Sequence, residues 1–399
     1  MKNIISIILV LLVFGFTSAQ EVSYDTITPL EDYNFVLGTQ GIGGKYKFSN
    51  ESALLEQAKH IRGMGSNILK ISLGKNALKG YGLRNAKTNT TLDLFKSSPD
   101  FKQAFDMDFK YIFAWVHTCT GVNWKKGITV QQEKLLYNEM YELASYLLKS
   151  YNNSGKTFLI GNWEGDWLLH NGNGRESTPG PEIIRNMTKW FQIRQKAIDA
   201  AKLKTPHNNV SLFHYIELNL VLKGMEGEKC IAESVLPNVP VDLVSYSSYE
   251  AIKNRSYDEV YDTLDSVFKY LEKQLQPKEG LPFSRRVFIG EYGYHANIEK
   301  PETFKKQRKL TKDIMEISLK LNLPFALHWQ MYNNEYDKNG GSKEMSLINE
   351  QGEKRPLYYF HKQYYQHMNN YLKTYKSEHG NYPDQTEFNT KALSVLKSI

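Results

Sequence analysis

Eight short runs of apolar, β-branched and aromatic residues recur along the chain, with helical patterns between them. These runs cover residues 34–38, 67–73, 109–117, 157–160, 210–216, 242–246, 286–290 and 324–329. In the intervening segments, such as 51–64 and 302–321, apolar side chains recur at helical spacing. Strands that alternate with helices form a parallel sheet, and eight such units close it on itself. The sequence therefore predicts an α/β fold, a (β/α)8 TIM barrel with long loops after its strands.

The domain organisation follows from where these units begin and end. We expect one barrel domain over residues 20–360, followed by a C-terminal helix and a loosely held tail over 361–399. Residues 73–108 and 218–239 separate consecutive strands by unusually long stretches, and we expect both to be loop insertions. Long loops are uncommon in compact domains unless they serve a function.

The N-terminus has the pattern of a cleaved secretory signal. A lysine at position 2 precedes an apolar run over 4–16, and small residues follow up to Ala19. The run is shorter than the roughly 20 residues of a membrane-spanning helix. We therefore expect residues 1–19 to be a signal peptide, the mature protein to be secreted or periplasmic, and no stable membrane insertion after cleavage. An uncleaved N-terminal anchor is the alternative.

Charge and cysteine content narrow the function classes. The formal net charge is +7, but the lysines are scattered rather than gathered with aromatic residues. A nucleic-acid-binding protein is expected to show a basic stripe or a recognisable module, so nucleic acid is not a predicted partner. Cys119 and Cys230 are the only cysteines, and they form either one disulfide or two buried thiols.

Two glutamates stand where predicted strands break into loops rich in glycine and aromatic residues. Glu164 lies within Gly-Asn-Trp-Glu-Gly-Asp-Trp at the end of the fourth strand, and Glu291 lies within Ile-Gly-Glu-Tyr-Gly at the end of the seventh. Active sites of such barrels lie at the C-terminal ends of the strands. A pair of carboxyl groups about 5–5.5 Å apart suits retaining cleavage of a glycosidic bond. Asp166 and Glu217 are the alternative acids.

Glutamates on strands four and seven, with Trp329 ending strand eight, make this chain resemble the retaining glycoside hydrolases of clan A. The resemblance implies that Glu164 is the acid/base and Glu291 the nucleophile, acting on a poly- or oligosaccharide. It also implies that Trp329 forms part of the platform under the sugar, and that Tyr246 lies near the nucleophile. A hydrogen bond from Tyr246 would then stabilise ionised Glu291.

The motif around the first glutamate departs from this pattern. The clan usually has asparagine immediately before the acid/base, whereas Trp163 stands there in this chain and Asn162 is one position further back. Alternation along a strand puts Asn162 and Glu164 on the same side, so we expect Asn162 to bind a sugar hydroxyl. Burial of Trp163 and Trp167 beside Glu164 would raise the pKa of its carboxyl.

Other strand-end residues complete the predicted substrate site. Carbohydrate sites stack flat aromatic faces on sugar rings, and Trp163, Trp167 and Tyr292 are placed for this. We expect Trp124 either to contact sugar or to pack at the barrel edge, and Trp115 and Trp190 to belong to the core. His117 and His328 are further candidates for hydrogen bonds to the substrate.

Histidines offer a competing interpretation of the same face. His117, His214, His295 and His328 fall at or near the ends of strands three, five, seven and eight. Some enzymes gather such residues with carboxylates around a divalent metal. No close-spaced histidine pair accompanies them, so we predict neither a metal nor a cofactor. A metal-dependent barrel hydrolase or isomerase, and a non-catalytic carbohydrate-binding barrel, remain the alternatives.

Overall fold

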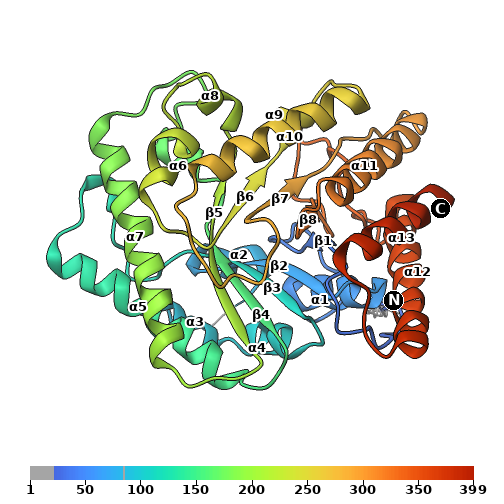
Figure 1. The fold of residues 1–399 in the computed structure, drawn as a ribbon, viewed down its shortest axis with the longest axis horizontal. Coiled ribbons are helices and arrows are strands. Elements are labelled where there is room, and N and C mark those ends of the chain that lie inside the picture. Colours follow the sequence, from blue (N-terminus) through green and yellow to red (C-terminus); the bar gives the residue numbers. More distant parts are fainter. Residues whose placement is uncertain (1–21, 84–85) are drawn as a thin grey trace, which may run out of the picture.

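The computed structural model describes residues 22–83 and 86–399, so the expected signal peptide lies outside the described residues. Eight parallel strands form a closed barrel in sequence order (Figure 1). They are β1 (Leu37–Gln40), β2 (Ile68–Leu73), β3 (Tyr111–Val116), β4 (Thr157–Gly161), β5 (Ser211–Leu218), β6 (Leu243–Ser247), β7 (Val287–Tyr292) and β8 (Ala326–His328). The predicted (β/α)8 barrel is confirmed.

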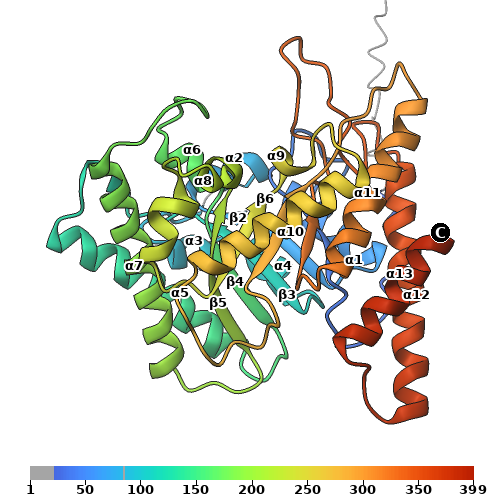
Figure 2. The same ribbon diagram turned by 45° about the horizontal axis from the view of Figure 1, so that its top comes forward.

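Helices surround the barrel and follow its strands in turn (Figure 1). Those covering its outer face include α1 (Ala53–Met64), α5 (Val130–Ser150), α7 (Pro181–Lys204), α10 (Tyr257–Gln274) and α11 (Glu302–Lys320). The short helices α6 (Gly165–Leu169), α8 (Val221–Met225) and α9 (Tyr249–Ile252) directly follow β4, β5 and β6. In Figure 2 these three helices lie together along the upper side of the molecule.

The two stretches expected as loop insertions contain helices. The first holds α2 (Lys75–Tyr81), α3 (Thr91–Ser97) and α4 (Pro99–Asp106), and the second holds α8 with a π-helical segment (Ile231–Val235) and a 3-10 turn (Leu236–Asn238). Local signals explain α3 and α4, because the Thr90 side chain caps the first and Pro99 opens the second. Their aromatic side chains, including those of Phe95 and Phe105, are buried.

Two layers of apolar side chains hold the barrel together. Phe113 of β3 contacts the rings of Tyr215, Phe288 and Phe325 from strands β5 and β7 and from the segment before β8. These aromatic residues therefore fill the barrel interior, while a larger cluster packs between the strands and the helices. Both follow from near-continuous apolar strands that are buried on both faces.

An irregularity in β7 shapes the end of the barrel. The register with β6 shifts after Tyr246, so that Ser247 pairs with Glu291, and the register with β8 shifts between Ile289 and Tyr292. Strict alternation would place Phe288 and Tyr292 on the same face. Instead Phe288 belongs to the interior cluster and Tyr292 to the outer one. The shift turns the Glu291 side chain toward the barrel mouth.

The C-terminal segment contains the expected helix, but a second helix takes the place of the expected loose tail. The segment forms α12 (Pro356–His379) and α13 (Gln385–Ser398), which pack beside α11 and α1 (Figure 1). Asp384 caps α13, and the side chains of Phe388, Ala392 and Leu396 are fully buried. Within the described residues, no helix is both long enough and apolar enough to cross a membrane.

Candidate functional site

A cavity of about 380 Å3 lies at the end of the barrel where the strands finish. Its walls come from the segments that follow β4, β5, β6, β7 and β8. Both predicted catalytic residues, Glu164 and Glu291, line it, together with Trp163, Trp167, Ser247 and Trp329. The structure thus brings together side chains that lie far apart in the sequence, because parallel barrel strands all end on one face.

Glu164 sits between β4 and α6, and two donors hold its carboxyl group. Trp167 Nε1 donates to Oε2 at 2.8 Å, and Ser247 Oγ donates to Oε1 at 2.5 Å. Burial raises the pKa of Glu164 to about 7, and the negative charge of Glu217 adds to this rise while the two hydrogen bonds oppose it. Such a carboxyl group can both release and accept a proton near neutral pH.

Glu291 lies on β7 and is 3% exposed. Its Oε1 has no hydrogen-bond partner among the described residues, and the Nζ of Lys70 lies 3.8 Å from it. Burial raises the pKa of Glu291 above its ordinary range, the charge of Lys70 opposes this, and the carboxylates of Glu164 and Glu217 add to it. One buried cation, Lys70, thus lies close to the carboxyl groups of both Glu217 and Glu291.

Lys70 and Glu217 form the floor beneath this cavity. Lys70 projects from β2 and Glu217 from β5, both side chains are fully buried, and they form an ion pair at 2.7 Å. Ser245 Oγ donates to the same Glu217 oxygen at 2.8 Å. A Cβ on Gly290 would come within 1.7 Å of Ser245 Oγ and 2.8 Å of Glu217 Oε2, so glycine is required there.

Three of the predicted aromatic residues face the cavity. Trp163 is 37% exposed, and Trp167 lies beside Glu164 through the hydrogen bond described above. Trp329 is 6% exposed and its ring centroid lies 6.1 Å from that of Trp115, which in turn lies 4.4 Å from the Lys70 ammonium. The Trp163 indole is exposed, and the Trp329 indole is held in place by the neighbouring Trp115 ring. Both suit stacking on sugar rings.

Asn162 does not line the cavity, contrary to the expectation that it binds a sugar hydroxyl. Its side-chain oxygen accepts from the Glu217 main-chain N–H at 3.1 Å, and its nitrogen donates to the Glu217 carbonyl at 2.9 Å. The amide therefore ties the end of β4 to the end of β5. The prediction assumed that side chains alternate between the two faces of a strand, but β4 ends at Gly161, before Asn162.

Tyr246 and Tyr292 also lie away from the cavity. Tyr246 is fully buried on the outside of the barrel, where its ring meets Phe268 of α10 and its hydroxyl donates to Glu250 at 3.2 Å, not to Glu291. Tyr292 is fully buried in the outer layer. The predicted contacts of both residues were wrong. Regular alternation along β6 puts Tyr246 on the face opposite to Ser245 and Ser247, and the irregular register of β7 turns Tyr292 outward.

The two histidines proposed to bind substrate are not among the cavity residues. His328 is fully buried behind β8, with its ring centroid 5.2 Å from that of His361 on α12. His117 follows β3 and packs against Gly74 at the end of β2. Burial lowers the pKa of His117 to about 4, which keeps its ring neutral.

Sequence reasoning missed several cavity residues. Ser247 could have been found, since it lies two positions beyond Ser245 and four beyond Leu243 on one face of β6. Others had no local signal. The cavity includes two ion pairs, Arg175 with Glu250 at 2.7 Å and Lys343 with Glu335 at 2.9 Å, and the side chains of Asn219 and Tyr249.

The four strand-end histidines do not converge. His214 is fully buried, where Nδ1 shares a hydrogen bond with Gln195 at 3.0 Å, and only His295 reaches the cavity. In the described part of the chain, no three His, Cys, Asp or Glu side chains are grouped as a metal site would require. Cys119 and Cys230 are buried free thiols.

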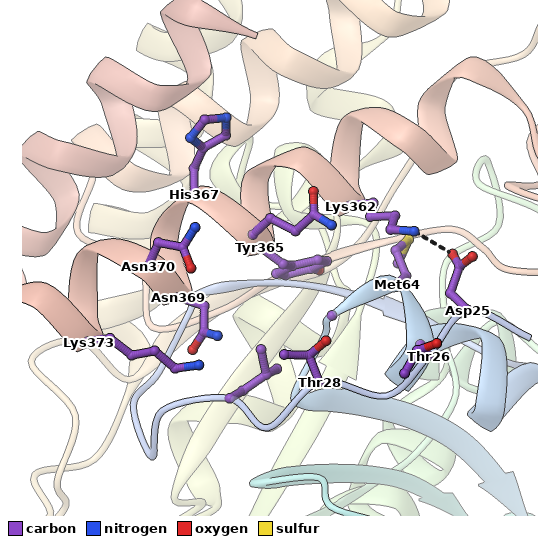
Figure 3. A pocket seen from close by; sticks show the side chains of 14 residues that line it. Asp25, Thr26, Thr28, Met64, Lys362, Tyr365, His367, Asn369, Asn370 and Lys373 are labelled. Carbon is purple, nitrogen blue, oxygen red and sulfur yellow. Dashed lines mark ion pairs between the residues drawn. The ribbon is translucent and has the colours of Figure 1, made fainter.

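A second, larger cavity of about 600 Å3 lies on the flank of the barrel (Figure 3). It is lined by the N-terminal segment, the end of α1 and one face of α12. Asp25 pairs there with Lys362 at 3.0 Å. The Asn369 side chain accepts from the Glu31 main-chain N–H and donates to the Pro29 carbonyl. These polar groups serve to dock the N-terminal segment against α12.

Comparisons with known proteins bear on the fold. No protein family model and no curated protein sequence matches the chain. Among solved structures, a calcium-binding mutant of Bacteroides uniformis β-glucuronidase 2 matches with a TM-score of 0.51 at 10% identity, covering 83% of this chain and 34% of that one. Parabacteroides merdae β-glucuronidase matches with a TM-score of 0.50 at 10% identity, covering 83% and 36%. Xylanase 10B from Thermotoga maritima matches at 17% identity with a TM-score of 0.45, covering 85% and 97%.

At 10% identity, the likeness to the two β-glucuronidases shows the barrel fold alone. The chain spans about a third of the length of the two β-glucuronidases.

Proposed function

We propose that this protein is a retaining glycoside hydrolase that cleaves O-glycosidic bonds of a poly- or oligosaccharide. The observation that carries the proposal is the placement of two buried carboxyl groups, Glu164 and Glu291, on one cavity in contrasting surroundings. Glu164 is held by two neutral donors, whereas Glu291 faces the Lys70 ammonium. Retaining glycosidases need one carboxyl group that keeps a proton and one that attacks as an anion.

In this mechanism Glu291 attacks the anomeric carbon while Glu164 gives its proton to the departing oxygen. Glu164 then removes a proton from water, which attacks the same carbon and releases the sugar from Glu291. Trp167 and Ser247 hold the Glu164 carboxyl group in place through both steps. Trp163 and Trp329 supply aromatic faces for the sugar rings on either side of the bond that breaks.

One observation favours a second candidate, a barrel that binds carbohydrate without cleaving it. Burial raises the pKa of Glu291, and a protonated carboxyl group cannot attack the sugar. In such a protein Glu291 would donate a hydrogen bond to a bound sugar. Lys70 opposes this state, since its charge stabilises the ionised form of Glu291.

The deciding experiment is a panel of polysaccharides and aryl glycosides, with and without EDTA, run on the protein and its Glu291→Gln variant. Glu139→Gln is the matched control, because Glu139 is also buried but caps main-chain groups outside the cavity. We expect cleavage by the protein and by the control, unaffected by EDTA, and almost none by Glu291→Gln. A substrate with fluorine at sugar carbon 2 should label the peptide that contains Glu291.

Binding without cleavage across the panel would favour the second candidate. Activity that EDTA removes and zinc or manganese restores would instead favour a metal-dependent hydrolase. Full activity of Glu291→Gln would reject the two-glutamate mechanism.

We also propose that the chain is exported, to the periplasm or outside the cell, after removal of residues 1–19. The support is the charged start, the short apolar run and the small residues before Gln20. N-terminal sequencing of the protein recovered from its native source should begin at Gln20. A sequence that begins at Met1 or Lys2 would reject cleavage.

A further inference from the structure

A third buried carboxylate lies beneath the proposed catalytic pair. Glu217 accepts hydrogen bonds from Lys70 Nζ at 2.7 Å and Ser245 Oγ at 2.8 Å, and Lys70 also donates to the Gly290 carbonyl at 3.0 Å. Neither Glu217 nor Lys70 lines the cavity, and both side chains are fully buried. Any effect of this pair on a bound substrate must therefore pass through other residues.

The pair contacts both proposed catalytic residues. Lys70 Nζ lies 3.8 Å from Glu291 Oε1, and the main-chain N–H of Glu164 donates to Glu217 Oε1 at 3.4 Å. The Asn162 side chain makes hydrogen bonds to both main-chain groups of Glu217. The end of β5 is thus fixed to the segment that carries Glu164, and the cation is fixed toward Glu291.

This geometry matches the movement of charge in a double displacement. In the first step Glu291 changes from an anion to a neutral ester, while Glu164 changes from a neutral acid to an anion. The total charge of the site stays the same, and the negative charge moves from one glutamate to the other. The Lys70–Glu217 pair presents its positive end to Glu291 and its negative end to the Glu164 segment.

We infer that Glu217 is a positioning residue of a fixed buried ion pair: it holds Lys70, whose positive charge favours the ionised form of Glu291, and its own negative charge beside Glu164 keeps the proton there before each turnover. This inference rests on the proposed function. Like charge beside Glu164 favours its protonated form, and opposite charge beside Glu291 favours its ionised form.

Other titratable groups face these glutamates and must be considered in a test. Tyr249 of α9 lies among the three carboxyl groups, and Glu335 from the segment after β8 faces Glu291. Neither of these two residues is altered in Glu217→Gln or Lys70→Met. A change in the titration of Glu164 then reports the loss of the buried pair.

The first measurement is the dependence of kcat/KM on pH. Glu217→Gln removes a negative charge near both glutamates, so both limbs of the profile should move to lower pH by about one unit. Lys70→Met removes a positive charge, so both limbs should move to higher pH. Glu217→Asp keeps the charge and should keep the limbs, as should the control Glu139→Gln. Equal loss of rate at every pH, with unmoved limbs, would overturn the inference.

The second measurement does not depend on turnover. Carbon-13 NMR of labelled glutamate carboxyl groups, with the Glu164 signal assigned by Glu164→Gln, should show a lower titration midpoint in Glu217→Gln and a higher one in Lys70→Met. An unmoved midpoint in the variants that fold would reject the role of the pair, even if Glu217→Gln itself fails to fold. A protein that cleaves no glycoside, but shows these shifts, would reject the proposed function alone.

Discussion

At the scale of single residues, the surroundings of Glu164 predict its kinetic signature. Burial raises the pKa of this carboxyl group to about 7, so a proton donor at this position is progressively lost above that pH. We expect kcat/KM to fall as pH rises through about 7. In Glu164→Gln this alkaline limb should disappear. Aryl glycosides with good leaving groups should lose far less activity than natural glycans, because they need little protonation.

The comparison of the two substrate classes provides the control for this prediction. A general defect in folding or binding would reduce activity toward both classes alike. If Glu164→Gln reduced cleavage of activated and natural substrates by the same factor, Glu164 would not be the proton donor.

Site residues that belong to a recognisable strand-end motif could be predicted from the sequence. Residues whose orientation depends on how neighbouring strands pair could not. Glu164, Glu291 and the tryptophans could be found because each follows a recognisable apolar run. Tyr292 was misplaced because a register shift in β7 reverses the faces, and no pattern in the chain signals that shift. Tyr246 was misplaced although β6 alternates regularly, because it lies on the face opposite to Ser245 and Ser247. Glu217 was predicted only as an alternative acid, and nothing in the sequence pairs it with Lys70 until the closed barrel brings β2 and β5 to the same interior.

At the scale of the element, β7 carries a glycine that the buried ion pair requires. A Cβ on Gly290 would come 1.7 Å from Ser245 Oγ and 2.8 Å from Glu217 Oε2. We expect Gly290→Ala to lower the free energy of unfolding by about 1–3 kcal/mol, as overpacking of a core does. Gly180→Ala is the control, since nothing lies within 4 Å of its Cβ position. Urea denaturation measures both, and equal stability of the two variants would contradict the packing described for β7.

Helix α12 introduces an acid sensitivity through its contact with β8. Burial lowers the pKa of His361 to about 4, and its Nδ1 shares a hydrogen bond with the Leu357 carbonyl. In the unfolded chain the same group takes up a proton below its ordinary value of 6.5. The unfolded state therefore binds more protons between those two values, and stability falls as pH drops from about 6.5 to about 4.

Replacement of His361 tests this linkage. In His361→Asn the slope of unfolding free energy against pH should decrease in that window by about 1.4 kcal/mol per pH unit, the effect of one proton. The exposed His379 on the same helix is the control, and His379→Asn should leave the slope as it is. A slope unchanged in both variants would show that His361 titrates normally in the folded protein.

The order of strands and helices was predictable, since each strand is an apolar run and a parallel sheet needs a crossover between neighbours. Of the two C-terminal helices, only α12 was predicted. The polar composition of α13 resembles a solvated tail, and its apolar face becomes apparent only where it meets α11 and α12.

At the scale of the whole molecule, the C-terminal helices support the seam where the barrel closes. The first and last strands, β1 and β8, are only 4 and 3 residues long. The hydroxyl groups of Tyr364 and Tyr365 on α12 donate to the carbonyls of Phe35 and Leu37, each at 2.9 Å. The end of the chain therefore holds the first strand in place beside the last.

Phe388 of α13 completes this support. Its side chain is fully buried, and its ring lies 4.9 Å from that of Tyr33 and 6.3 Å from that of Phe35, measured between centroids. We expect Phe388→Ala to lower the free energy of unfolding by about 3–5 kcal/mol, the usual result of removing a buried phenylalanine. The exposed Thr390 on the same helix is the control, and Thr390→Ala should change stability little. Because the proposed catalytic residues lie at the mouth of the barrel, the folded fraction of Phe388→Ala should keep its pH profile. A variant as stable as the control would mean that the barrel closes without its C-terminal helix.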